Sequence, residues 1–237
     1  MLSNLEAALG DAEAQFNLGV THDEGQGIPQ DILRRLYGLA AAQGDPDAQY
    51  NLGIMLHEGQ GGRKDLLVAR RLFGLAAAQG HVKAQFNLGV MHEDGQGGPQ
   101  DLAEARRLYG LAAAQGHARA QFNFGLMHDK GQGGRKDLPE ARRLYYLAAA
   151  QGNALAQFNL GVLHDKGQGG PQDLAEARRL YCLAAAQGLA CAQFNIGVMH
   201  DDGQGGPQDL AEARRLYGLA AAQGFADAQY NLGVMHD

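Results

Sequence analysis

The chain has 237 residues, of which 45% are hydrophobic and 19% charged, and its formal net charge is −6. It has no apolar run of about 18 residues, which excludes a membrane span, and its acidic balance argues against a nucleic-acid partner. The opening sequence MLSNLEAALGD lacks the basic start and apolar core of a secretory signal, so we expect a cytoplasmic protein. We expect no cofactor, no bound metal and no membrane partner.

The motif AQF or AQY recurs along the whole chain. Its aromatic residue returns once after 34 residues and then five times after 36 residues, and the motif LAAAQG keeps the same period. A fixed period of this length is the signature of a repeat protein, in which each repeat packs on its neighbours. The aromatic residues of the motif are Phe16, Tyr50, Phe86, Phe122, Phe158, Phe194 and Tyr230.

In chain order, the pattern predicts half a helix, then six helical pairs, then one last helix. Residues 1–10 resemble the second half of the second helix of a repeat, and serve as a cap. Residues 11–225 form six repeats of two helices, called helix A and helix B. Residues 226–237 form a lone helix A. No segment alternates with period two, so we expect no sheet.

The repeat that starts at residue 82 shows the local signals. The apolar spacing predicts helix A over 82–94, and Gly-rich residues 95–100 predict a turn. Asp101 and Glu104 have the spacing of a capping box at the start of helix B, and Gly116 suits its end. In the first repeat two residues are missing at the start of helix B, where residues 31–34 replace DLAEAR, and we expect its first turn to be trimmed.

One face of helix B is predicted to be buried, and one of its positions exposed. The apolar residues of the buried face are Leu102, Ala105, Leu108, Tyr109, Ala112 and Ala113. One position of helix B varies between glycine, tyrosine and cysteine. Residues of such different size could not fill the same buried space, so we expect this position to be exposed on the convex surface. Its residues are Gly38, Gly74, Gly110, Tyr146, Cys182 and Gly218. Within helix A, a recurring glycine such as Gly89 predicts the close approach of a neighbouring backbone.

The repeat AQFNLGVMHEDGQGGPQDLAEARRLYGLAAAQGHARA resembles the Sel-one-like repeat (SLR), a relative of the tetratricopeptide repeat (TPR). The shared pattern is Ala, then Leu-Gly, a Gly-rich loop, an Asp and Ala-Ala-x-x-Gly. The resemblance implies an all-α, right-handed α/α superhelical solenoid of 36-residue repeats, with A helices lining the concave groove. It also implies a non-enzymatic scaffold or adaptor that binds a protein or peptide. The family's aromatic residue after Leu-Gly is replaced here by His.

An asparagine recurs in every helix A and is the main candidate for ligand binding. Its amide offers donors and an acceptor for the backbone of an extended peptide. The alternative is a hydrogen bond between adjacent A helices. The asparagines are Asn17, Asn51, Asn87, Asn123, Asn159, Asn195 and Asn231, and Lys83, Arg119 and Asp94 share their stripe in the expected groove.

A histidine also recurs in helix A, and we expect it to contact helix B instead of binding a metal. Leu56 replaces it in the second repeat, with His57 displaced by one residue, which favours a packing role. Metal ligation or pH sensing is the alternative. The histidines are His22, His92, His128, His164, His200 and His236.

Arginine pairs recur in every helix B and make up 12 of the 20 basic residues. Glu104 lies three residues before Arg107, which predicts a solvated, salt-bridged face and disfavours a nucleic-acid or lipid site. The pairs are Arg34/Arg35, Arg70/Arg71, Arg106/Arg107, Arg142/Arg143, Arg178/Arg179 and Arg214/Arg215.

Two alternatives to the scaffold hypothesis stay open. One is a structural or self-assembling array, since the repeats are nearly uniform. The complementary half-repeats at the two ends then predict weak head-to-tail self-association, with Leu232 and Met235 in the contact. The other is a hydrolase of the cysteine-rich SLR kind, which is disfavoured because Cys182 and Cys191 do not repeat. Ser3 is the single serine, so no serine triad is expected.

Overall fold

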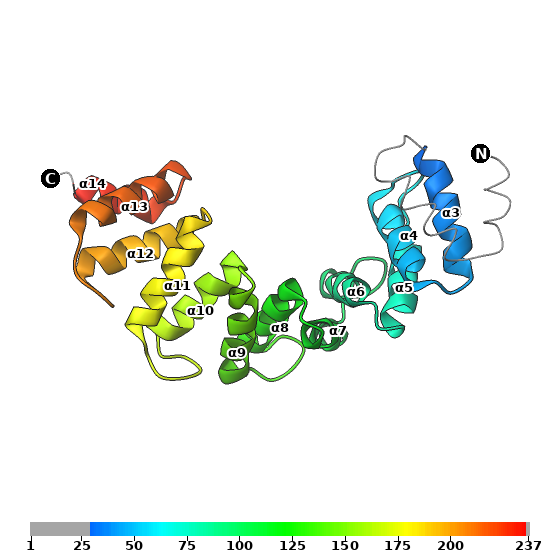
Figure 1. The fold of residues 1–237 in the computed structure, drawn as a ribbon, viewed down its shortest axis with the longest axis horizontal. Helices are drawn as coiled ribbons and strands as arrows, with labels where there is room; N and C mark the ends of the chain where they lie inside the picture. The colour runs from blue at the N-terminus through cyan, green and yellow to red at the C-terminus, as the bar shows by residue number, and fades with distance from the viewer. Residues whose placement is uncertain (1–28, 236–237) are drawn as a thin grey trace. The chain divides into compact units, whose positions relative to one another are not determined.

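The computed structural model describes residues 29–235, which form α-helices joined by short loops, with no strand in this range (Figure 1). The chain divides into two compact units, residues 1–117 and 118–237. The described helices of the first unit are α3 (Gln30–Ala42), α4 (Pro46–Glu58), α5 (Leu66–Ala78), α6 (Val82–Asp94) and α7 (Leu102–Ala114). Those of the second are α8 (Ala118–Lys130), α9 (Leu138–Ala150), α10 (Ala154–Asp165), α11 (Leu174–Ala186), α12 (Ala190–Asp202), α13 (Leu210–Ala222) and α14 (Ala226–Val234).

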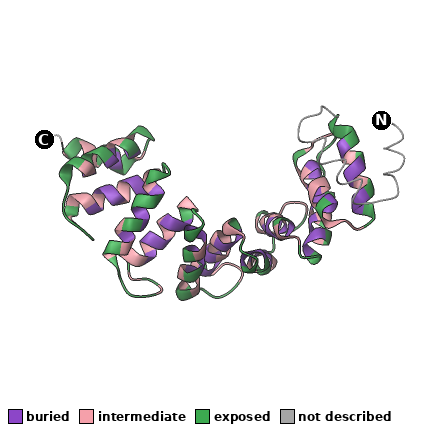
Figure 2. Cartoon of the chain, in the orientation of Figure 1, coloured by how far each residue is buried: buried purple, intermediate pink, exposed green. Residues whose placement is uncertain are grey.

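Even-numbered helices are the predicted A helices and odd-numbered helices are the predicted B helices. Within each unit, a helix packs against the one before and the one after it in the chain. Each helix buries one side and exposes the other, as the purple and green sides of the ribbons show (Figure 2). The predicted all-α solenoid of helical pairs is therefore confirmed. The predicted handedness of the superhelix stays a prediction.

Helix B starts at an aspartate, as predicted. Asp101 Oδ1 accepts a hydrogen bond from the backbone N–H of Glu104 at 2.9 Å, which satisfies one free donor of the first turn. The expected capping box is only half formed, because the Glu104 carboxylate binds Arg107 at 2.6 Å and does not return to the start of the helix. The Asp101 N–H instead donates to the carbonyl of His92 in helix A, which closes the loop between the two helices.

The first repeat corrects one expectation. Helix α3 has 13 residues, the same length as α5 and α7. The two missing residues therefore come from the loop and not from the first turn. What is lost is the cap, because Pro29 stands in the N-cap position and makes no side-chain cap hydrogen bond.

The predicted buried face of helix B forms the core. Ala105, Tyr109 and Ala112 are fully buried, and Leu108 is 1% exposed. The predicted exposure of the varying position of helix B is confirmed at Tyr146 (60%) and Cys182, whereas its glycines are half-buried.

The recurring glycine of helix A has a different reason from the one predicted. A Cβ on Gly89 would lie 2.8 Å from the ring of Tyr109, in helix B of the same repeat. The close neighbour is therefore an aromatic side chain and not a backbone. Gly53, Gly125, Gly161 and Gly197 meet the ring of Phe73 or of a tyrosine in the same way, whereas Gly233 meets nothing within 4 Å. Gly19 lies outside the described residues.

The glycine-rich loop packs on helix B of the preceding repeat. A Cβ on Gly97, which has φ +66°, would collide with the carbonyl oxygen of Leu66 at the start of α5. A Cβ on Gly98 would lie 2.7 Å from the guanidinium of Arg70. The GQGG sequence thus serves a contact between repeats.

We predict opposite effects for two Gly→Ala substitutions within the first unit. Gly89→Ala pushes a methyl group against a fully buried ring and should lower the free energy of unfolding by about 1–3 kcal/mol. Gly74→Ala adds a methyl group where nothing lies within 4 Å and should raise it by about 0.5–1 kcal/mol. Urea unfolding followed by circular dichroism measures both. Equal effects of the two substitutions would contradict the packing described.

Candidate protein-binding surface

The asparagines of helix A contact a tyrosine hydroxyl. Asn159, Asn195 and Asn231 hydrogen-bond to Tyr145, Tyr181 and Tyr217, respectively, each in helix B of the preceding repeat. These asparagines and the others in the described residues are half-buried, so part of each side chain is exposed. Asn17 lies outside the described residues.

Each of these tyrosines also donates to an acidic side chain at the end of helix A. Tyr145 Oη lies 3.4 Å from Asp129 Oδ2, and Tyr109 Oη lies 2.6 Å from Glu93 Oε2. The single hydroxyl proton is used by the carboxylate, so the oxygen accepts from the asparagine Nδ2. Burial and the nearby carboxylate raise the pKa of Tyr145, and burial raises that of Tyr217 to about 12, so the hydroxyls stay protonated.

The second repeat keeps this hydroxyl but moves it to the other helix. Helix α5 has Phe73 where the other B helices have tyrosine, and α4 has Tyr50 where most A helices have phenylalanine. The two rings pack together, with centroids 5.8 Å apart, and the Tyr50 hydroxyl hydrogen-bonds to Asn87. Here the bond joins two adjacent A helices, which is the alternative that the sequence raised. The asparagine keeps a hydroxyl partner although both aromatic residues have changed.

The other residues predicted for the groove are exposed. Lys83 in α6 and Arg119 in α8 lie near the helix starts, and Asp94 ends α6, where it accepts a hydrogen bond from Gln96 at 3.2 Å. The two basic residues lie in different units, so they are separate features of the two surfaces.

The varying residue before each helix A is its N-cap. Asp45, His81 and Asn153 each accept a hydrogen bond from the N–H three residues later, whereas Leu189 and Phe225 do not. Where this residue is aromatic, its ring also packs on the preceding helix A. His81 stacks on Tyr50 at 4.6 Å between centroids and binds Asp47 at 3.0 Å, and the Phe225 ring centroid lies 5.2 Å from that of Phe194. Variation at this position therefore changes the capping of helix A and its packing on the preceding helix A.

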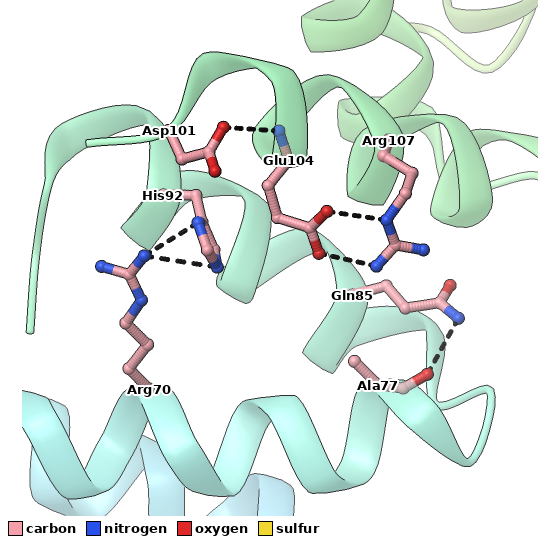
Figure 3. A network of polar contacts seen from close by, with 7 residues as sticks. All are labelled: Arg70, Ala77, Gln85, His92, Asp101, Glu104 and Arg107. Carbon is pink, nitrogen blue, oxygen red and sulfur yellow. Dashed lines mark hydrogen bonds and ion pairs between the residues drawn. The ribbon is translucent and has the colours of Figure 1, made fainter. Parts of the chain in front are cut away.

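The recurring histidine contacts helix B, as predicted, but through a hydrogen bond. Arg70 in α5 donates from Nη2 to Nδ1 of His92 in α6 at 2.8 Å (Figure 3), and the same contact joins Arg142 to His164 and Arg178 to His200. An arginine can only donate, so the histidine nitrogen must be unprotonated. His128 is 9% exposed and meets Phe124 edge-on. His22 and His236 lie outside the described residues.

The two arginines of each pair have different roles. Where a glutamate lies three residues earlier, the second one is salt-bridged, as predicted: Arg107 holds Glu104 through two nitrogens at 2.6 and 2.7 Å, which lowers the pKa of that carboxyl (Figure 3). Arg35 and Arg71 have Ile32 and Val68 in place of this glutamate. The first arginine does not belong to the solvated face. Arg70 also donates to the carbonyls of Gln96 and Pro99, at 3.2 Å each, and so joins helix B to the loop of the next repeat.

A buried glutamine is the polar residue that the sequence motifs did not single out. Gln85, the middle residue of AQF, is 4% exposed and donates to the carbonyl of Ala77 at 3.2 Å (Figure 3). Its Oε1 accepts from Nε2 of Gln115 at 2.8 Å. Equivalent buried glutamines are Gln49, Gln121, Gln157 and Gln193. The signal available in the sequence was that both glutamines recur in every repeat.

No group of three His, Cys, Asp or Glu side chains able to hold a metal occurs in residues 29–235. In the same range, no helix has the length and apolar character needed to cross a bilayer. Both thiols are unpaired, and burial raises the pKa of each, which disfavours a thiolate nucleophile. Leu232 and Met235 pack partly buried near Tyr217, while the N-terminal half of the expected head-to-tail contact lies outside the described residues.

The fold and these contacts define an α-helical repeat protein built of paired helices. The Sel1 repeat model matches nearly the whole chain, so the chain belongs to the Sel1 repeat family. The matched residues are 12–45, 46–81, 82–117, 118–153, 154–189, 192–225 and 226–237. Scaffolds of this family typically mediate protein interactions and are generally non-catalytic.

Solved structures agree with this family. The chain is similar to a protective antigen present in uropathogenic Escherichia coli strains displaying an SLR fold, with 33% identity and a TM-score of 0.92 over 98% of this chain. It spans 50% of the length of that protein. A Sel1 repeat protein from Oxalobacter formigenes is 31% identical, with a TM-score of 0.76, 90% of this chain and 86% of that chain being covered. Comparison with curated protein sequences gives no match.

The histidines held by arginine predict a loss of stability as the pH falls. Burial, and then the charge of arginine, lowers the pKa of His92, His164 and His200 below the ordinary 6.5. The unfolded state therefore binds more protons, so the stabilisation is full above pH about 6.5 and is lost as the pH falls through the folded pKa. The charged groups that act on His92 are Arg70, Asp101, Glu104 and Arg107.

We expect the melting temperature to fall between about pH 7 and about pH 5, and the variant with all three of these histidines changed to leucine to lose most of this slope. Leu56 occupies the position naturally, so leucine is compatible with the fold. Calorimetry over this range measures both slopes. An unchanged slope in the triple variant would show that other groups cause the pH dependence.

Proposed function

We propose that the chain is a non-enzymatic scaffold that binds an extended segment of a protein or peptide along its A helices. The observation that carries this proposal is the asparagine held in place in successive repeats. The tyrosine hydroxyl uses one amide donor, which leaves the second N–H and the carbonyl oxygen for a further contact. An amide held by the fold loses little side-chain entropy on binding.

The surroundings of the asparagines support a peptide more than a small molecule. The stripe of helix A that carries the asparagines also includes exposed charged residues that differ between repeats, such as Lys83, Arg119 and Asp94. Amides can hold the backbone of a peptide whatever its side chains, while these charges can select among sequences. The typical role of Sel1 repeats in protein interactions agrees with this proposal.

The test separates ligand binding from interhelical bonding with two double variants of the second unit. Asn159→Ala/Asn195→Ala removes the amides. Tyr145→Phe/Tyr181→Phe removes the same interhelical hydrogen bonds but leaves the amides in place, and Phe73 shows that phenylalanine fits this position. Peptides enriched from a random phage-displayed library on the unmodified protein serve as probes.

We expect the asparagine variant to bind the enriched peptides about tenfold or more weakly, because two hydrogen bonds of about 0.5–1.5 kcal/mol each are lost. The tyrosine variant should bind almost as well as the original protein, with a similar loss of stability to that of the asparagine variant. Fluorescence anisotropy gives the affinities and urea unfolding the stabilities. Unchanged peptide binding by the asparagine variant would reject the amides as binding groups.

A further inference from the structure

Helix B carries a central glycine that no packing contact requires. A Cβ on Gly38, Gly74 or Gly218 would meet no heavy atom within 4 Å, in contrast to Gly89 of helix A. Glycine inside a helix lowers its stability relative to alanine. The position is also open to larger residues, because Tyr146 and Cys182 occupy it in other repeats. The glycine therefore leaves a space open and does not admit a neighbouring helix.

That space is a pocket between two successive B helices. In the first unit a pocket of about 480 Å³ lies between α5 and α7. Gly74 and Ala77 of α5 line one side, Leu111 of α7 lines the other, and Leu88 of α6 lies between them. Arg107, held by its glutamate, also lines the pocket. The pocket therefore has apolar side chains on α5, α6 and α7 and the Glu104–Arg107 ion pair at its edge.

The second unit repeats this pocket with a different residue at the central position. Between α9 and α11 the residue is Tyr146 and the pocket measures about 320 Å³. Between α11 and α13 the residue is Cys182 and the pocket measures about 440 Å³. Free volume thus decreases in the order glycine, cysteine, tyrosine. The varying residue sets how much of the pocket is open.

Tyr146 indicates which side chain such a pocket accepts. It lines its pocket together with Leu183 and Arg179 of the facing helix α11, and 60% of its surface stays exposed. Arg107 and Arg215 hold the same place in the other two pockets. A guanidinium favours the face of an aromatic ring, and apolar walls favour its burial.

We propose that the pockets at Gly74 and Cys182 each receive a tyrosine side chain from a partner protein, and that Tyr146 narrows its own pocket by taking up part of that space. The B helices then form a second interaction surface, independent of the asparagines on the A helices. The pocket with tyrosine is narrower than those with glycine and cysteine, so the order of these residues favours some docking places over others.

The first test uses p-cresol, the tyrosine side-chain analogue, and the natural thiol of Cys182. The background is Cys191→Ser, because Cys191 lines none of the three pockets. At about four times its dissociation constant, p-cresol should slow alkylation of Cys182 about fivefold, since about four fifths of the pockets are then filled. Cyclohexylmethanol, which is not aromatic, should protect much less. Equal protection by both, or none by p-cresol, would overturn the proposal.

The second test follows the methyl resonances of Leu111 and Leu183 during a p-cresol titration. Leu111 should shift in the original protein, and Gly74→Tyr should reduce this shift. Tyr146→Gly should enlarge the shift of Leu183 at a given p-cresol concentration. Gly218→Tyr is the matched control, because no helix B follows α13 in the described residues, and it should leave the Leu111 shift unchanged. An unchanged Leu111 shift in Gly74→Tyr would contradict the assignment, whatever the outcome for the asparagines.

Discussion

One buried amide joins three helices in each repeat, and the rest of the structure is arranged around it. Gln85 in α6 donates to the end of α5 through the Ala77 carbonyl and accepts from Gln115 at the end of α7. A buried amide that lost these partners would keep its full cost of desolvation. The bond therefore fixes the position of each helix A between two B helices.

Other contacts between repeats follow from this arrangement. With helix A fixed, the glycine-rich loop lies over helix B of the preceding repeat, where Arg70 binds its carbonyls and Gly97 meets the backbone. The second repeat shows that the arginine contact does not need the histidine. Leu56 replaces the histidine in its helix A, yet Arg34 of the first repeat still donates to the Arg63 carbonyl at 3.1 Å. The histidine adds a pH-sensitive bond to a contact that the loop already provides.

Local signals predicted the helices well because they act within a few residues. Asp101 and Gly116 start and end helix B as expected, since capping depends on the adjacent backbone. Residues that act between repeats were harder to assign. Glutamine is usually found at the surface, so the residue type alone does not predict that Gln85 is buried. Arg70 and Arg71 are the same residue type, so the sequence does not distinguish their roles. The two arginines differ only in the folded chain, where Arg70 contacts the loop of the next repeat.

The candidate surface was predicted in part. The asparagines are partly exposed, but their tyrosine partners lie about 14 residues earlier in the chain, in a different repeat, and could not be paired from spacing alone. The exchange of aromatic residues between Tyr50 and Phe73 likewise makes sense only in three dimensions. The sequence predicts that the varying position of helix B is not in the core, whereas the pocket at Gly74 requires two B helices side by side.

A double-mutant cycle between Gln157 and Gln187 tests the central role of the buried amide most directly, because their side chains are joined at 2.8 Å. Gln157→Leu, Gln187→Ala and the double variant would be unfolded in urea, and Gln79→Ala, in the other unit, would be the distant control partner for Gln157→Leu. The account predicts a coupling free energy of about 1 kcal/mol or more between Gln157 and Gln187, and additivity within about 0.5 kcal/mol for the control. Additive effects of Gln157→Leu and Gln187→Ala, with only a small loss from the first, would contradict it.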